Sequence, residues 1–482
     1  MEINKKCQVF TPEENVQQLL DNVGYRRNLY NRKVAENSCG DGNILSVIVI
    51  RYIEDCLTNK ISKSNIKKGL EEDIYGAEID EEHIKNCIIK LNCITEKYGI
   101  KHVNWNIYQG DFLKLNLVNK FDFVIGNPPY ISYLELSNET RAFLRENYSI
   151  CKNGKFDYCY AFIQAGINAL TIQGRLAYLI PGNIFKNQFA SALRELMLPR
   201  LTDIYDYTNL KLFKNKLTSS AIIVYDNTIN KNYIVYHDMV NNNKYNINKS
   251  SLTEKWKFER NTELNNEHIR FGDVFHAASS VATLLNKVFI IDKYKCEDIY
   301  LRVGDQKIEM SILRRAVSPR SLNYKKDEFV IFPYRYYDGK LIRFSETEFE
   351  ESFPFATQYL LSYKSELDNR NSDKGIKWFE YGRSQALAHL NQEKLLTSTL
   401  ITKEVKSYML DAHTIPTSGL YIISKGIYDL KTAKKILDSP EFLEYVKKIG
   451  VISNGNSFRI SPKDINEYHF LYSKEMLVNG RN

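Results

Sequence analysis

The segment Asn127-Pro128-Pro129-Tyr130 holds the side chains best suited to chemistry in this chain. It follows residues 121–126, whose apolar types predict a short buried strand. Ligands of open α/β sheets bind just outside the carboxyl ends of the strands. Because the two prolines restrict the backbone, the Asn127 side-chain oxygen and a neighbouring main-chain carbonyl can accept both hydrogens of a planar amino group. Tyr130 can offer its ring face to a heterocycle, so the segment favours a reaction at an exocyclic nitrogen.

An acid followed by a glycine-rich loop ends an earlier predicted strand, at 33–36. Gly40 would let the backbone approach a ligand closely, and Glu36 could bind the ammonium of an amino-acid group. The loop lacks the Lys-Ser/Thr pair that follows the glycines of a phosphate-binding loop. A plain tight turn at the start of a helix would use the same residues, so this motif alone leaves both interpretations open.

Two further acids follow the next two predicted strands. Glu78 is placed to accept hydrogen bonds from ribose hydroxyls, whereas Asp80 is expected to cap the helix that starts near residue 81. Asp111 could accept a hydrogen bond from an adenine amino group while Phe112 covers the ring. An ordinary strand-end turn would also use Asp111 and Phe112, so this motif is open when taken alone.

These motifs lie in a stretch that alternates apolar runs with helical patterns, as a doubly wound α/β domain does. We predict this domain over 1–226, a linker over 227–267 in which Asn and Lys are frequent, and an α+β domain over 268–482. The polar, lysine-rich residues 58–73 are expected to form a surface excursion. The predicted strands are 33–36, 74–78, 103–108, 121–126, 174–180, 202–207 and 220–225, and the predicted helices are 43–56, 81–98, 158–170 and 189–198.

The order of the four motifs along the chain resembles that of S-adenosylmethionine-dependent N6-adenine DNA methyltransferases, in particular the TaqI-like, gamma-class group. The resemblance implies a Rossmann-like catalytic domain followed by a target-recognition (specificity) domain. It also implies transfer of a methyl group from S-adenosylmethionine to N6 of an adenine flipped out of double-stranded DNA. The supporting segments are 8–12, 157–162 and 174–181 in the first half and, more weakly, 275–290, 332–334 and 377–385 in the second.

The same resemblance implies roles for individual residues. The catalytic residues facing the target adenine would be Asn127, Pro128, Pro129 and Tyr130, with Phe213 as a second wall for the flipped base. A core position is the alternative for Phe213. The cofactor would be bound by Thr11 and Glu36 at its methionine end, Gly40 for clearance, Glu78 at the ribose, Ile79 and Phe162 around the adenine, and Asp111 and Phe112 at the base amine and ring.

One position departs from the family pattern. The usual acidic-Pro-Ala-Cys loop is here Glu36-Asn37-Ser38-Cys39. Loss of the proline is expected to loosen the loop, because proline fixes the backbone angle φ. The Asn37 side chain could add or remove a contact with the cofactor.

Arginine side chains in the second half offer forks for phosphate groups or guanine edges. We expect Arg335 and Arg383 to bind DNA, from a set that also contains Arg314, Arg315 and Arg320. The partners expected from the resemblance are double-stranded DNA and a companion restriction endonuclease, with the protein acting as a monomer.

Length and composition limit the number of domains and the kinds of partner and site that this protein can have. A chain of 482 residues exceeds one comfortable core, so at least two domains are expected. The net charge of +8 is compatible with a polyanionic partner. No apolar run approaches the roughly 18 residues of a membrane span, and the N-terminus has no secretory signal, so we expect a cytoplasmic protein without a membrane partner. The eight cysteines are scattered without a Cys-x-x-Cys pair, so no metal site is expected.

Other functions share the four-residue signature. Some enzymes that methylate a protein glutamine amide carry it, as do some RNA methyltransferases, and these remain the alternative substrates. A long second half rich in aromatic residues and arginine favours DNA. A non-catalytic DNA-binding subunit is disfavoured because all four motifs are intact. A fused nuclease is not expected, because residues 1–7 leave no room for one before the first motif.

Overall fold

The computed structural model describes residues 13–208, 220–258, 268–453 and 457–471. Two compact units divide the chain, Met1–Thr262 and Glu263–Asn482, and each is described by itself. Predicted residues Thr11 and Phe213 lie outside the described residues. Among the described residues, no helix combines the length and apolar character of a membrane span.

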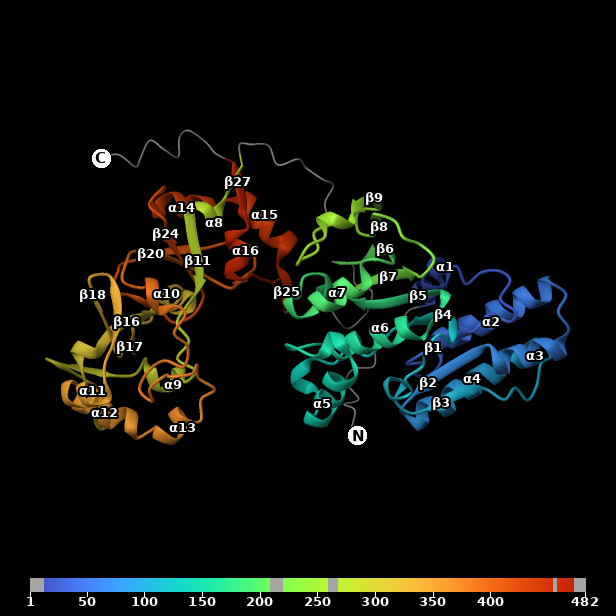
Figure 1. Ribbon diagram of the computed structural model, residues 1–482, viewed down its shortest axis with the longest axis horizontal. Coiled ribbons are helices and arrows are strands. Elements are labelled where there is room, and N and C mark those ends of the chain that lie inside the picture. The colour runs from blue at the N-terminus through green and yellow to red at the C-terminus, as the bar shows by residue number, and fades with distance from the viewer. Residues whose placement is uncertain (1–12, 209–219, 259–267, 454–456, 472–482) are drawn as a thin grey trace. The chain divides into compact units, whose positions relative to one another are not determined.

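The first unit is built on a nine-stranded sheet with the order β3-β2-β1-β4-β5-β7-β6-β8-β9 (Figure 1). Strands β1 to β5 are parallel to one another, whereas β7 is antiparallel to both β5 and β6. The chain winds from β1 outward through β2 and β3, then returns to the other side of β1 with β4. The strands are β1 (Val34–Glu36), β2 (Ile74–Glu78), β3 (Asn106–Gln109), β4 (Phe121–Gly126), β5 (Leu170–Pro181), β6 (Leu201–Asp206), β7 (Ser220–Asp226), β8 (Tyr233–Asp238) and β9 (Asn243–Asn248).

Helices cover both faces of this sheet because the strands are apolar on both sides. Alternate residues of a strand point to opposite faces. Val34, Phe123 and Ile125 accordingly belong to one core cluster, and Ala35 and Val124 belong to the other. The first face packs against α1 (Glu13–Val23), α2 (Asn43–Thr58), α3 (Lys63–Glu72) and α4 (Glu81–Lys97), and the second against α5 (Asn138–Asn147), α6 (Tyr158–Ala169) and α7 (Ser191–Met197).

The predicted α/β class and the order of the first seven strands are confirmed. The surface excursion predicted over 58–73 is wrong, since most of it forms helix α3. The Ser62 side chain caps that helix by accepting a hydrogen bond from the Asn65 amide at 3.3 Å. Ile66 and Leu70, one turn apart, are fully buried. Because lysines surround them in the sequence, the composition alone does not indicate this apolar helix face.

The linker predicted over 227–267 is also wrong in its first part. Strands β8 and β9 extend the sheet beyond β6, so the first unit continues to Thr262 rather than ending at residue 226. Ile234, Tyr236 and Ile247 are buried in the core at alternating positions, which is the strand period. Trp256, 1% exposed, stacks on Phe185 with ring centroids 5.8 Å apart.

The second unit mixes short helices with small sheets whose strand pairs are almost all antiparallel, as expected for an α+β domain. The larger sheets have the orders β11-β24-β20-β22 and β12-β17-β16-β23. Its helices are α8 (Phe271–Val274), α9 (Asn286–Phe289), α10 (Pro319–Asn323), α11 (Glu346–Ser352), α12 (Pro354–Leu361), α13 (Lys364–Asp368), α14 (Leu430–Leu437), α15 (Pro440–Ile449) and α16 (Pro462–Asn466). Its strands are β10 (His268–Arg270), β11 (Phe275–Ser279), β12 (Ile290–Ile291), β13 (Lys295–Glu297), β14 (Tyr300–Val303), β15 (Gln306–Glu309), β16 (Leu313–Val317), β17 (Glu328–Ile331), β18 (Tyr334–Tyr337), β19 (Lys340–Arg343), β20 (Lys394–Thr397), β21 (Leu400–Ile401), β22 (Ser407–Leu410), β23 (Ile415–Pro416), β24 (Leu420–Ser424), β25 (Val451–Ser453), β26 (Ser457–Arg459) and β27 (His469–Leu471).

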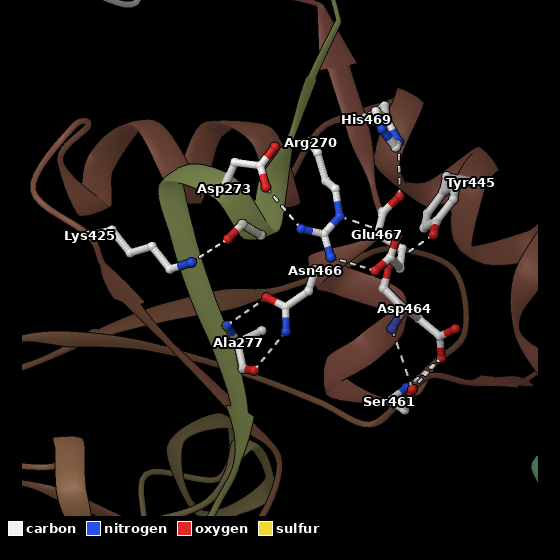
Figure 2. A network of polar contacts seen from close by, with 11 residues as sticks. Arg270, Asp273, Ala277, Lys425, Tyr445, Ser461, Asp464, Asn466, Glu467 and His469 are labelled. Atoms are coloured by element: carbon white, nitrogen blue, oxygen red, sulfur yellow. Dashed lines mark hydrogen bonds and ion pairs between the residues drawn. The ribbon is translucent and has the colours of Figure 1, made fainter.

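A polar network joins the first and last described segments of the second unit (Figure 2). Strand β10 pairs with β27, and the Arg270 guanidinium contacts Glu467 through Nε at 3.2 Å and Nη2 at 2.5 Å. Arg270 also donates to Asp273 at 2.9 Å. The Asn466 side chain accepts from the Ala277 amide at 2.9 Å and donates to the Ala277 carbonyl at 3.0 Å. One side chain therefore completes the hydrogen bonding of a strand β11 residue.

We expect Asn466→Ala to loosen this closure. The substitution leaves both main-chain groups of Ala277 without their partner, which costs about 1–3 kcal/mol where such groups are shielded from water. Amide hydrogen exchange followed by mass spectrometry should show faster exchange over Phe275–Ser279. Asn323→Ala, at an exposed position of α10, is the matched control and should leave exchange unchanged. Equal protection of β11 in both variants would contradict the role of Asn466.

Candidate functional site

The predicted site residues gather at the carboxyl ends of β1 and β4, the point where the strand order reverses. Strand β1 has β2 on one side and β4 on the other, and both pairings are parallel. The two chains that leave β1 and β4 therefore emerge at the same edge of the sheet. Crevices at such a reversal are where open α/β sheets bind ligands. Glu36 ends β1, and Asn127 follows the last residue of β4.

Asn127 is half-buried and is held from two sides. The Ser38 hydroxyl, from the loop after β1, donates to the Asn127 main-chain carbonyl at 3.3 Å. The Tyr130 hydroxyl lies 2.6 Å from Asn127 Oδ1 and 2.7 Å from the main-chain carbonyl of Leu179 on β5. Three neighbouring strand ends thus fix the Asn-Pro-Pro-Tyr segment. Burial raises the pKa of the Tyr130 hydroxyl well above its ordinary value, so this hydroxyl stays protonated.

Glu36 is buried, 2% exposed, beneath the start of helix α2. One carboxylate oxygen accepts a hydrogen bond from the Leu45 amide at 2.9 Å, which satisfies one of the amides that a helix leaves open in its first turn. Burial raises the pKa of Glu36 well above its usual range, although the hydrogen bond from the Leu45 amide opposes this. The raised pKa favours the neutral carboxyl, so Glu36 would be ionised only with a positive charge, such as an ammonium, beside it.

The glycine loop and Glu78 are joined directly. The Gly40 amide donates to Glu78 Oε2 at 2.9 Å, while the Ile79 and Asp80 amides donate to Oε1 at 2.8 and 3.0 Å. An ionised carboxylate offers about four lone-pair sites, so a ribose hydroxyl at Glu78 would have to share oxygens with these amides. Gly40 has φ +49°, and a Cβ there would meet no atom within 4 Å. The side of Gly40 on which a side chain would stand is therefore open space.

Asp80 caps helix α4, as predicted, by accepting from the Glu82 and His83 amides at 2.9 and 3.4 Å. The residues that bind Glu78 and the residues that Asp80 caps follow one another directly after β2. Asp80 is thereby occupied by structural bonds, which separates its role from that of Glu78.

Asp111 has a structural bond and a side-chain partner. Its Oδ1 accepts from the Leu113 amide at 3.0 Å, and the Tyr158 hydroxyl donates to Oδ2 at 3.3 Å. Burial raises the pKa of Asp111, against the opposing effect of the Leu113 amide. Phe112 and Phe162 are each 3% exposed and belong to one core cluster, so both rings serve the core in this structure. Any contact with a cofactor ring would use the small part of each ring that stays accessible.

Three polar residues of this region have partners that the sequence did not predict. Ser38 and Tyr158 contact Asn127 and Asp111, and the Asn37 amide donates to the Tyr178 hydroxyl on β5. Asn37 is 2% exposed, and its Oδ1 has no hydrogen-bond partner among the described residues. The only signal in the sequence was the replacement of proline by Asn37, which marked the position without giving its partner.

The amino-acid sequence matches a family model over residues 51–213, described as Eco57I restriction-modification methylase. Two relatives extend further. The Type II restriction enzyme and methyltransferase RM.Eco57I of Escherichia coli is 24% identical over 85% of this chain and 51% of its own length. The Type II methyltransferase M.BstVI of Geobacillus stearothermophilus is 24% identical over 94% of this chain and 87% of its own length. The chain is similar to the Eco57I-like restriction-modification methylases. It spans about half the length of the E. coli relative.

Solved structures share the fold. The Type IIL restriction-modification enzyme MmeI in complex with DNA has a TM-score of 0.53 at 14% identity, over 94% of this chain and 64% of that one. A nuclease-deletion mutant of the Type ISP enzyme LlaGI, with a DNA substrate mimic, has a TM-score of 0.53 at 13% identity, over 86% of this chain and 41% of that one. At such low identity these likenesses concern the fold alone.

The two arginines expected to bind DNA are both paired with acids of the second unit. Arg335 Nη1 lies 2.8 Å from Glu348, and Arg383 Nη1 lies 2.7 Å from Asp373. Each guanidinium would have to exchange its carboxylate for a phosphate. Within the described residues, Arg320 is exposed and has no ion pair, whereas Arg315 lies 3.8 Å from Asp327.

Asp157 makes the stability of the first unit depend on pH. It caps α6 by accepting from the Cys159 amide at 3.0 Å, and burial raises its pKa to about 6 from 3.8. The folded state therefore binds more protons than the unfolded state between roughly pH 4 and 6, so the free energy of unfolding falls as pH rises through this window. Asn caps helices equally well and does not titrate. We expect Asp157→Asn to have little effect at pH 4 and to stabilise by about 2 kcal/mol at pH 7, measured by urea unfolding.

Asp429, the cap of α14, is the matched control for this titration. Slight burial acts to raise the pKa of Asp429, but hydrogen bonds from Thr432 prevail and lower it. Its contribution to stability is present above the ordinary aspartate pKa and is lost as pH falls, so Asp429→Asn should have the opposite pH trend. An Asp157→Asn effect that is the same at pH 4 and pH 7 would contradict the analysis.

Proposed function

We propose that this protein transfers a methyl group from S-adenosylmethionine to N6 of a flipped-out adenine at specific sites in double-stranded DNA. The observation that carries the proposal is the placement of Asn127 at the reversal of strand order, held by Ser38 and Tyr130. The similarity to Eco57I-like restriction-modification methylases supports the reaction class. The adenine target rests on the Asn-Pro-Pro-Tyr segment and the resemblance it carries.

The residues around the crevice fit the cofactor. Beyond Gly40 the space is open, although its positive φ and its bond to Glu78 fix the loop itself. Acidic acceptors stand at successive strand ends, which suits a ligand with an ammonium, two ribose hydroxyls and a base amine. When bound, the cofactor supplies a methyl group activated by a sulfonium. The residues that would hold it are Thr11, Glu36, Gly40, Glu78, Ile79, Asp111, Phe112 and Phe162.

Asn127 and Pro128 would act on the target amine. The lone pair of adenine N6 is delocalised into the ring, so the free amine is a poor nucleophile. The Asn127 side-chain oxygen and the Pro128 carbonyl would each accept one N6 hydrogen and favour a pyramidal nitrogen. These acceptors stabilise the positive charge that develops on nitrogen, and they are oriented before the reaction starts. Holding N6 close to the methyl group and in line with it would contribute further to the rate of transfer.

The target base must leave the duplex to reach such a crevice. The Tyr130 ring would stack on the extruded adenine and offset part of the lost base stacking, by about 1–3 kcal/mol. Phe213 is proposed as the opposite wall and Pro129 as part of the rigid turn. We further propose that residues of the second unit read the DNA site, with Arg335 and Arg383 exchanging their acidic partners for DNA.

The biological setting proposed is restriction-modification, with a companion endonuclease and a monomeric methyltransferase. Among the relatives, RM.Eco57I is named as both restriction enzyme and methyltransferase, and it is about twice the length that this chain matches. An orphan methyltransferase would have the same chemistry. The two settings differ only in the partner.

Methylation-sensitive sequencing of DNA tests the proposal most directly. Plasmid DNA from cells that express the protein should carry N6-methyladenine at one recurrent sequence, and DNA from cells expressing Asn127→Ala should carry none. Purified protein should label the same sites from radioactive S-adenosylmethionine. Label on RNA or on a protein glutamine amide, with DNA unlabelled, would assign the alternative substrates and overturn the DNA proposal.

Asn127→Ala should remove catalysis and leave cofactor binding intact. Loss of one preorganised acceptor lowers turnover by about 100- to 1,000-fold, as for other oriented hydrogen-bonding groups that act in the transition state. Calorimetric titration with S-adenosylmethionine should give a dissociation constant within about twofold of the parent, because the cofactor residues are separate. If cofactor affinity fell as far as turnover, Asn127 would be a binding or folding residue instead.

A further inference from the structure

We propose that the Tyr130 hydroxyl is a positioning group for the Asn127 carboxamide, distinct from the stacking role of its ring. The inference rests on the proposed function of Asn127 as an acceptor for the target amine. It concerns one atom, Tyr130 Oη, which lies 2.6 Å from Asn127 Oδ1 and 2.7 Å from the Leu179 carbonyl oxygen. A ring that only stacks would have no use for this hydroxyl.

The two contacts compete for one hydrogen. A tyrosine hydroxyl carries a single donor hydrogen, whereas both neighbours are carbonyl-type oxygens that accept. When the hydrogen points to Asn127 Oδ1, it occupies one of that oxygen's two lone pairs and fixes the plane of the amide. When an amine hydrogen reaches Oδ1, the hydroxyl can turn to Leu179 and remain bonded. The Leu179 carbonyl is therefore a second acceptor, so the Tyr130 hydroxyl can rotate away from Asn127 Oδ1 and still donate a hydrogen bond.

The surroundings make this arrangement rigid. Leu179 pairs with Ile222 of β7, one residue beyond the last β5 residue that pairs with β4, and is fully buried, so the sheet holds its carbonyl in place. Ser38 separately holds the main-chain carbonyl of Asn127. Backbone and side chain of Asn127 thus have independent supports, from β1 and β5 respectively. Removing the Tyr130 hydroxyl should take away one support of the Asn127 carboxamide, at Oδ1, and leave the main-chain support in place.

The predicted effect is a loss of turnover without a loss of binding. In Tyr130→Phe the ring is retained, so stacking on the extruded base should be unchanged. A carboxamide that has lost its hydrogen bond at Oδ1 spends less time in the reactive orientation, and we expect kcat to fall about 10-fold or more. The KM for DNA and the dissociation constant of S-adenosylmethionine should stay within about twofold.

Tyr133→Phe is the matched control. Tyr133 lies three residues along the chain from Tyr130. Its hydroxyl accepts a hydrogen bond from Arg145 Nη2 at 2.9 Å, and Arg145 Nη2 also donates to the Gly154 carbonyl at 3.2 Å. This variant loses a tyrosine hydroxyl from the same segment without touching Asn127. It should keep parental kcat. Equal kcat for the parent and Tyr130→Phe, or equal losses in both variants, would overturn the positioning role.

A double-mutant cycle tests whether the hydroxyl acts through Asn127. Single-turnover rates with excess protein are measured for the parent, Tyr130→Phe, Asn127→Ala and the double variant. If the hydroxyl positions the amide, Tyr130→Phe should change the rate less than about twofold once the amide is absent. A loss that persists in full in the Asn127→Ala background would overturn the inference. A double variant too slow to measure leaves the decision to the comparison with Tyr133→Phe.

The parent protein separates this inference from the proposed function. If the parent labels no nucleic acid or protein amide, the proposed function fails. If the parent is active and Tyr130→Phe matches it, the proposed function stands and the positioning role alone fails. Thermal unfolding midpoints of both phenylalanine variants, compared with the parent, report whether either substitution perturbs the fold.

Discussion

The parallel pairing of β1 with β4 is the constraint on which the candidate site depends. Its register sets Val34 opposite Phe123 and Ala35 opposite Val124, so the two strands end at the same level. Residues 36–38 and 127–130 then emerge side by side, although about 90 positions of sequence separate them. The Ser38 contact with Asn127 is the direct consequence. A shift of this register would move the acid loop away from the Asn-Pro-Pro-Tyr segment and undo the site.

Main-chain amides hold most of the acidic groups at this edge. Glu36 binds an amide of α2, Glu78 binds three amides of two loops, and Asp111 binds the start of a short helical turn. Amides are fixed donors, so the carboxylates are oriented before any ligand arrives. Burial raises the pKa values of Glu36 and Asp111 even with these partners, so the amides offset only part of the cost of burying the charge. The ends of β1, β2 and β3 thus present acids whose side chains are oriented by main-chain amides, which suits a cofactor with an ammonium and hydroxyl groups.

The second unit closes on itself by a different means. Few of its strand pairs are parallel. Its first and last described strands pair with each other, and contacts of Arg270, Asn466 and Glu467 join these two ends. Acid partners for Arg335 and Arg383 keep those guanidiniums in defined orientations while no other anion is bound.

The sequence by itself determined the class of the first unit, the order of its first seven strands and the place of the four motifs at strand ends. It could do so because apolar periodicity and proline or glycine turns are local signals. It missed strands β8 and β9, whose Asn- and Lys-rich composition masked buried Ile234 and Ile247. Only the tertiary structure decided which groups meet. The contacts of Ser38 with Asn127 and of Tyr130 with Leu179, and the burial of Phe112 and Phe162 in one core, join segments far apart in the chain, and no local pattern encodes such contacts.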